Sequence, residues 1–223
     1  MSALPALNHF GNARAPVVTV DGIGQDAPSV RATAATLAPY GVVGNAYPGL
    51  RRVLSEADSD AFAYATALLE AAAPYLGGAF GIDGFDMIEA SFSLVTTPAT
   101  ALTPVQRAPH YDSLDANLYA VLHYLAPCAG TAFYRHRMSG IEMLSPANME
   151  SYVAAARTAE QPPGYIIGDN PNYERIGAVE GLEGRLVGYP ARLLHSGIIP
   201  PDFMPSSDPA TGRLTTNIFI RAR

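Results

Sequence analysis

Short segments of alternating apolar and polar residues dominate the second half of the sequence and constrain the fold more than any other feature. Alternation with a period of two is typical of β-strands that bury one face. Gly and Pro residues interrupt the chain between these segments, as expected for turns. We therefore predict strands at residues 87–97, 117–125, 131–137, 185–194 and 213–221, with an earlier one at 15–23.

Apolar residues spaced three to four positions apart, as in a helix, occur only in limited segments of the chain. A helix is predicted over 56–75, with Ser55 as its N-cap and Gly77 and Gly78 as its terminators. Further helices are predicted at 28–37 and 146–159, the second followed by a turn-rich stretch at 161–173. Helices followed by a run of short strands indicate a mainly β fold, with helices packed on one face of a sandwich or barrel.

The chain length limits the number of domains. With 223 residues, 48% of them hydrophobic, the sequence fits one compact domain with a sizeable core. Nothing in it marks a linker. We expect a single domain over 1–223, with helical support in about residues 1–85 and a β core in about 86–223.

Charge and cysteine content exclude several classes of protein. The net charge is −6, and every basic side chain is an arginine, scattered along the chain. A basic face for nucleic acid is therefore not expected. No apolar run has the length of a membrane helix, and the first residues lack a signal pattern. The single cysteine, Cys128, is expected to be a small buried residue in a reducing, cytoplasmic environment.

The pattern His110-Tyr111-Asp112 brings an imidazole and a carboxylate together. On an extended segment, residues i and i+2 point to the same side, so His110 and Asp112 can share a metal. The pattern also recurs by chance. His195 ends an apolar run before a glycine, and taken alone it reads as an ordinary core histidine. Together, two histidines and one carboxylate are the ligand set of non-heme Fe(II) oxygenases.

A possible anion clamp follows these residues in the sequence. Arg213 and Thr215 alternate to one face of the last predicted strand. A guanidinium beside a hydroxyl is suited to binding a carboxylate, although an ordinary surface arginine would give the same local pattern. The order His-x-Asp, distant His, then Arg-x-Thr carries more information than any of its parts.

With these motifs the chain resembles the Fe(II)/2-oxoglutarate-dependent oxygenases, and most of all the small prolyl-hydroxylase-like members. The resemblance covers most of the chain. It implies a double-stranded β-helix, a cupin-like jelly roll, with Fe(II) held by His110, Asp112 and His195. It also implies 2-oxoglutarate as co-substrate and O2 as oxidant. In several members a tyrosine at the position of Tyr124 hydrogen-bonds the distal carboxylate of 2-oxoglutarate, to which Arg213 and Thr215 are also assigned.

The sequence departs from the prolyl-hydroxylase pattern in two places. A Gly-Gly-x-Thr element is reduced to Gly130-Thr131, and the segment at about 138–184 is long. These departures leave the substrate open between a peptide or amino-acid side chain and a small metabolite. Hydroxylation is the default outcome, because Asp112 occupies the position that halogenating relatives leave free for chloride. A homodimer is compatible with the sequence.

Two other classes of protein remain open. One is a non-catalytic jelly-roll binding protein, and the other is a cupin-type metal enzyme that does not use 2-oxoglutarate. The first has no need of a complete ligand set, and the second usually has three histidines and leaves Arg213 without a task.

Other polar residues carry weaker signals. His123 and His136 read mainly as packing or surface residues, and His9 has no partner in the sequence. Arg135 and Arg137 are candidate binders of an anionic substrate or of 2-oxoglutarate itself, with packing as the alternative. Residues 171–175 are a candidate lid, with a structural loop as the equal alternative.

Overall fold

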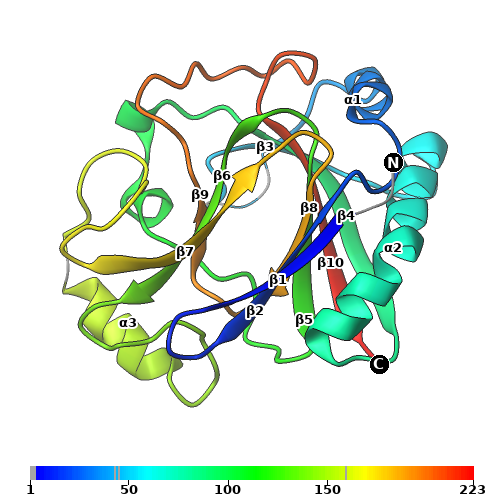
Figure 1. Ribbon diagram of the computed structural model, residues 1–223. Coiled ribbons are helices and arrows are strands. Elements are labelled where there is room, and N and C mark those ends of the chain that lie inside the picture. The colour runs from blue at the N-terminus through cyan, green and yellow to red at the C-terminus, as the bar shows by residue number, and fades with distance from the viewer. Residues whose placement is uncertain (1–3, 43, 45, 159) are drawn as a thin grey trace.

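Two antiparallel sheets form the framework of the protein. A computed structural model describes residues 4–42, 44, 46–158 and 160–223 (Figure 1). The larger sheet has the order β1-β2-β8-β5-β10-β4-β3, and the smaller has the order β7-β6-β9. The larger comprises β1 (Leu4–Phe10), β2 (Ala15–Asp21), β8 (Leu186–Pro190), β5 (Leu118–Tyr124), β10 (Leu214–Ala222), β4 (Phe85–Val95) and β3 (Gly49–Val53). The smaller comprises β7 (Tyr173–Gly181), β6 (Cys128–His136) and β9 (His195–Gly197).

The two sheets pack against each other through an apolar layer. Phe133 of β6 meets Tyr189 of β8 edge-on, with ring centroids 5.2 Å apart. Residues of both sheets fill the layer around them, among them Ala15, Val17, Ala120, Val179 and Val187. Facing antiparallel sheets joined by such a core are the architecture of a jelly roll. The predicted double-stranded β-helix is confirmed.

Helices cover the outer faces of the two sheets. α1 (Ala27–Thr36) and α2 (Ser59–Phe80) pack on the larger sheet, and α3 (Met149–Arg157) packs beside the smaller one (Figure 1). Two short 3₁₀ helices, η1 (Ala99–Ala101) and η2 (Pro104–Arg107), lie between β4 and β5. None of the helices in the described ranges is both long and apolar enough to cross a membrane.

The ends of α2 differ from the prediction. Ser55 does not cap it, because the Ser55 backbone N–H donates to Asp58, which stands at the N-cap position. Gly77 and Gly78 lie inside the helix, and the chain leaves it at Gly81 in the left-handed conformation, with φ of +65°. Leu76 beside them is fully buried. Burial of this apolar face therefore outweighs the low helix propensity of glycine.

Four strands, β1, β3, β7 and β9, were not predicted, and one predicted strand ends early. β1, β3 and β7 lack a clear apolar alternation, since β1 is an exposed edge strand and β3 has only five residues. β7 lies in the long 138–184 segment, which is therefore not one loop. The predicted strand at 185–194 ends at Pro190, where the chain leaves the larger sheet, and His195 begins β9 in the smaller one.

Candidate metal centre and co-substrate cavity

Backbone pairing brings two of the predicted metal ligands together. The N–H of His110 donates to the carbonyl of His195 at 2.9 Å, and the N–H of His195 donates back to His110 at 2.8 Å. Residues directly opposite each other in an antiparallel pair project to the same side. The two imidazole rings accordingly lie 4.3 Å apart between centroids. Asp112 is fixed beside them by its N–H, which donates to the carbonyl of Ala191 at 2.7 Å.

The three side chains converge on one point. One ligand atom from each of His110, Asp112 and His195 lies within 4.8 Å of the other two. The Asp112 carboxylate is 3.8 Å from Nε2 of His110 and 3.5 Å from Nε2 of His195. Nδ1 of His195 lies 2.8 Å from the carbonyl of Leu193, which only accepts, so Nδ1 carries the proton and Nε2 keeps its lone pair.

The electrostatics of the trio favour a cation. Burial and the neighbouring His195 together lower the pKa of His110 to about 4, while Asp112 opposes the shift. Burial likewise lowers the pKa of His195 to about 4. Burial raises the pKa of Asp112, which His110 and Arg51 partly offset. Two neutral imidazoles beside a carboxylate present lone pairs to a divalent metal, so the donor set fits Fe(II).

The predicted clamp residues line the same cavity as the trio. The cavity has a volume of about 400 Å³ and is lined by His110, Asp112, His195, Arg213 and Thr215 among others. The guanidinium of Arg213 donates to the Gly130 carbonyl at 3.1 Å, while its buried Nε has no partner among the described residues. A Cβ at position 197 would stand 3.3 Å from Nη2 of Arg213, so Gly197 makes room for the guanidinium.

Tyr124 occupies a different position from the other predicted site residues. It does not line the cavity, and its hydroxyl lies 2.7 Å from Oγ1 of Thr131, which does. Burial raises the pKa of Tyr124 to about 12, and nearby Arg213 opposes the shift. Thr131 therefore forms the cavity wall in front of the tyrosine, a role that the sequence interpretation did not assign to it.

Several cavity residues were missed in the sequence. They come from separate segments and include Tyr47, Arg51, Gln106, Tyr165 and Asn217. Asn217 continues the alternation of Arg213 and Thr215 along β10, and its side chain accepts a hydrogen bond from the Thr215 hydroxyl at 2.9 Å. That alternation is a usable signal, whereas no local pattern marks the other four.

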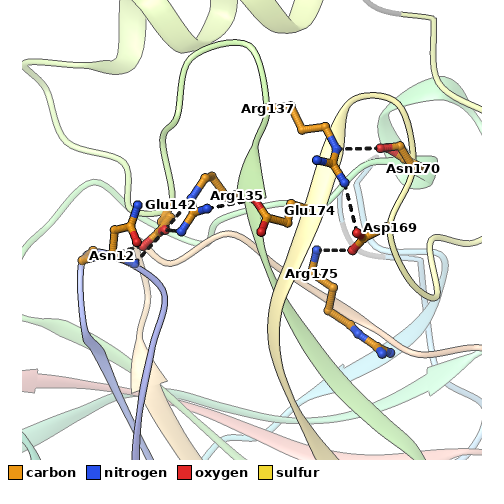
Figure 2. A network of polar contacts seen from close by, with 9 residues as sticks. Asn12, Arg135, Arg137, Glu142, Asp169, Asn170, Glu174 and Arg175 are labelled. Atoms are coloured by element: carbon orange, nitrogen blue, oxygen red, sulfur yellow. Dashed lines mark hydrogen bonds and ion pairs between the residues drawn. The ribbon is translucent and has the colours of Figure 1, made fainter.

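The two candidate anion binders, Arg135 and Arg137, do not line the cavity. Arg135 binds Glu142 at 2.7 Å and Glu174 at 2.8 Å, and Arg137 binds Asp169 at 3.0 Å (Figure 2). Their guanidinium groups are engaged by carboxylates on and beside the smaller sheet. Neither arginine is therefore placed to bind an anion in this cavity.

The candidate lid, residues 171–175, does not border the cavity, so this segment is a structural one. No residue of 171–175 lines the cavity, and the last three of them belong to β7. Tyr165, from the same long segment, does line it, and its hydroxyl donates to the Thr97 carbonyl at 2.7 Å. His123 and His136 are buried away from the cavity, as packing residues.

Sequence comparison assigns the chain to a family. A model described as a family of unknown function (DUF6445) matches residues 2–220. The chain belongs to the DUF6445 family. No curated protein matches the sequence.

Solved structures show what this DUF6445 chain resembles in three dimensions. One is the non-heme alpha-ketoglutarate-dependent epimerase SnoN from nogalamycin biosynthesis, at 16% identity and a TM-score of 0.55, covering 94% of this chain and 79% of that one. HygX from Streptomyces hygroscopicus, with nickel and 2-oxoglutarate bound, is 13% identical with a TM-score of 0.56, covering 92% and 82%. The carbocyclase SnoK is 10% identical with a TM-score of 0.53, covering 92% and 79%.

These similarities establish the fold. At such low identity they do not carry over an activity or a substrate. They include an epimerase and a carbocyclase, so the predicted closeness to prolyl hydroxylases is not specific.

Proposed function

We propose that this protein is an Fe(II)- and 2-oxoglutarate-dependent oxygenase that hydroxylates a small molecule or a peptide side chain. One observation carries the proposal. A single cavity contains both a two-histidine, one-carboxylate ligand set and a buried arginine whose Nε lacks a partner among the described residues. A metal site alone needs only the first feature.

In this proposal His110, Asp112 and His195 hold the iron. The Leu193 carbonyl fixes the tautomer of His195, so that its Nε2 stays directed toward the metal position. Three protein ligands leave further coordination positions for 2-oxoglutarate and O2. When bound, the iron and 2-oxoglutarate supply the oxidative chemistry that breaks an unreactive C–H bond.

Arg213 and Thr215 hold the far carboxylate of 2-oxoglutarate. A guanidinium that is removed from water binds a carboxylate more strongly than an exposed one does. Tyr124 supports this arrangement through its hydrogen bond with Thr131, which orients the Thr131 hydroxyl at the cavity wall. The aromatic side chains of Tyr165 and Tyr189 limit the access of water to the cavity.

The two alternatives predict different ligand dependence. A non-catalytic binding protein would not respond to metal, and a cupin-type metal enzyme would respond to metal but not to 2-oxoglutarate. The buried Arg213 favours the proposed function over both. A cytoplasmic location, a homodimer and a single domain over 1–223 stay predictions.

Thermal unfolding with Mn(II) and N-oxalylglycine, an unreactive analogue of 2-oxoglutarate, tests the proposal. Ligands that bind only the folded state raise the midpoint of unfolding. We expect Mn(II) to raise it and N-oxalylglycine to raise it further only when Mn(II) is present. Arg213→Ala should keep the metal effect and lose the second increment. If the analogue has no effect on wild-type protein saturated with Mn(II), the proposed co-substrate is wrong.

A further inference from the structure

We propose that Arg51 docks an oxyanion of the substrate, so that the substrate is a small organic acid. This inference rests on the proposed function, because it takes the cavity as the place of reaction. It concerns a residue that has no task in binding the metal or 2-oxoglutarate.

The register of the larger sheet places Arg51 on the inner face. Arg51 of β3 pairs with Ser93 of β4, and Ser93 also pairs with Thr215 of β10. Side chains in one row of an antiparallel sheet project to the same side. Arg51 accordingly lines the cavity together with Thr215, while its neighbour Arg52 points to the opposite face and pairs with Asp58 at the start of α2.

The guanidinium of Arg51 is held on one side only. Its Nη2 donates to Glu89 at 2.6 Å and to Ser91 at 2.7 Å. Its Nε is buried and has no partner among the described residues. Glu89 and Ser91 thus orient the group without satisfying it. A buried cationic N–H without an acceptor is unfavourable, and a ligand oxygen would remove that cost.

Arg51, which pairs with Glu89 outside the cavity lining, is the one lining cation in the described part of the chain without a task in binding the metal or 2-oxoglutarate. The ionised side chains among the described lining residues are Arg51, Asp112 and Arg213. In the proposed function Asp112 binds the metal, and Arg213 binds the far carboxylate of 2-oxoglutarate. Under the proposed function the other carboxylate of 2-oxoglutarate would bind the metal, which would leave Arg51 without a role in holding the co-substrate.

The environment of Tyr47 also indicates that the guanidinium groups of Arg51 and Arg213 face the same part of the cavity. Burial raises the pKa of Tyr47, and the charges of Arg213 and Arg51 both oppose the shift. Its phenol therefore lies within the field of both guanidinium groups. A volume of about 400 Å³ lies at the low end for ligand pockets, which favours a small molecule over a peptide.

Titration calorimetry with matched acids and neutral analogues tests the proposal. The probes are acetate, phenylacetate and phenyl phosphate, against acetamide, phenylacetamide and phenol. They are titrated into metal-free protein and into protein saturated with Mn(II) and N-oxalylglycine, where the Arg213 position is filled. We expect an acid to bind at least about tenfold more tightly than its neutral analogue in both samples, as for a charge-assisted hydrogen bond. The preference for carboxylate or phosphate identifies which oxyanion the substrate carries.

Two variants assign the preference to one arginine. In protein saturated with Mn(II) and N-oxalylglycine, Arg51→Gln should reduce the preference to about twofold or less, whereas Arg52→Gln, an equal change of charge on the same strand, should leave it intact. Should Arg51→Gln fail to fold, Glu89→Gln provides the test, because it removes a competing carboxylate and should tighten acid binding severalfold. No preference in the wild-type protein, or one that survives Arg51→Gln in protein saturated with Mn(II) and N-oxalylglycine, overturns the inference.

The outcome separates this inference from the proposed function. If Mn(II) and N-oxalylglycine bind but acids are not preferred, only the role of Arg51 fails. If metal-free protein shows an Arg51-dependent preference but Mn(II) and N-oxalylglycine have no effect, the anion site stands and the oxygenase assignment fails.

Discussion

His110 and His195 exchange both backbone hydrogen bonds although 85 positions separate their residue numbers, with N···O distances of 2.9 and 2.8 Å. This bridge joins the segment after η2 to β9 and aligns the two imidazoles through the backbone. The site is therefore preorganised by the sheet, and ligand substitutions should alter metal affinity without unfolding the protein.

Asp112→Asn is expected to weaken Mn(II) binding at least about tenfold, because the amide keeps the shape of the side chain but not its charge. Calorimetric titration of the apo protein measures the change. Asp115→Asn is the control, since Asp115 pairs with Arg221 away from the cavity. Equal affinities of the wild type and Asp112→Asn would remove Asp112 from the ligand set.

Gly197→Ala is expected to weaken N-oxalylglycine binding severalfold while Mn(II) affinity stays unchanged. The new Cβ would lie 3.3 Å from Nη2 of Arg213 and displace the guanidinium. Gly168→Ala is the matched control, because a Cβ there meets nothing within 4 Å. Both affinities come from titration calorimetry, and unchanged analogue binding would mean that Arg213 does not hold the co-substrate.

His123 should make stability depend on pH. Its Nδ1 lies 2.6 Å from the Tyr64 hydroxyl, and burial lowers the pKa of His123 from 6.5 to about 4. The unfolded chain therefore takes up the proton first, and stability falls as the pH drops from about 6.5 toward about 4. The loss attributable to this residue is at most about 3 kcal/mol.

Urea unfolding at several pH values measures this effect. His123→Gln should flatten the pH dependence, although His110, His136 and His195, whose pKa values are also lowered, keep part of it. His9→Gln, a substitution of an exposed histidine on β1, is the control and should leave the slope unchanged. An identical slope in wild type and His123→Gln would contradict the prediction.

Glu142→Gln is expected to destabilise the protein by about 3 kcal/mol or more, as for a broken buried ion pair. Glu142 is 4% exposed, accepts the backbone N–H groups of Asn12 and Ala13, and binds Arg135 (Figure 2). It thereby ties the β1–β2 turn to the smaller sheet. Asp86→Asn, in an exposed pair with Arg223, should cost less than about 1 kcal/mol by the same urea unfolding assay. Equal losses of unfolding free energy in the two variants would mean that Glu142 does not hold the β1–β2 turn against the smaller sheet.

The sequence was most informative where a strand has one buried face. Alternation predicted β4, β5, β6 and β10, and the i, i+2 spacing correctly placed Arg213 and Thr215 on one face of the chain. It failed for β1 and β3, because exposed or very short strands need no apolar face and are stabilised by pairing with a neighbour.

Only the site residues that belong to a local sequence motif could be predicted. His-x-Asp and Arg-x-Thr are local patterns, whereas Arg51 enters the cavity through the pairing of β3 with β4, which no local pattern records. Arg135 and Arg137 show the converse error. Their alternation is real, but carboxylates distant in the sequence, such as Glu142, decide where the guanidinium groups go.

Anaerobic titration of the Fe(II)-loaded protein with 2-oxoglutarate tests the central claim most directly. The chelate of iron with the keto acid has a weak visible charge-transfer band, which requires both partners in one cavity. We predict that the band appears in the wild type, saturates at one 2-oxoglutarate per chain, and needs much higher 2-oxoglutarate in Arg213→Ala. Iron-loaded wild-type protein that develops no band at saturating 2-oxoglutarate would contradict the account.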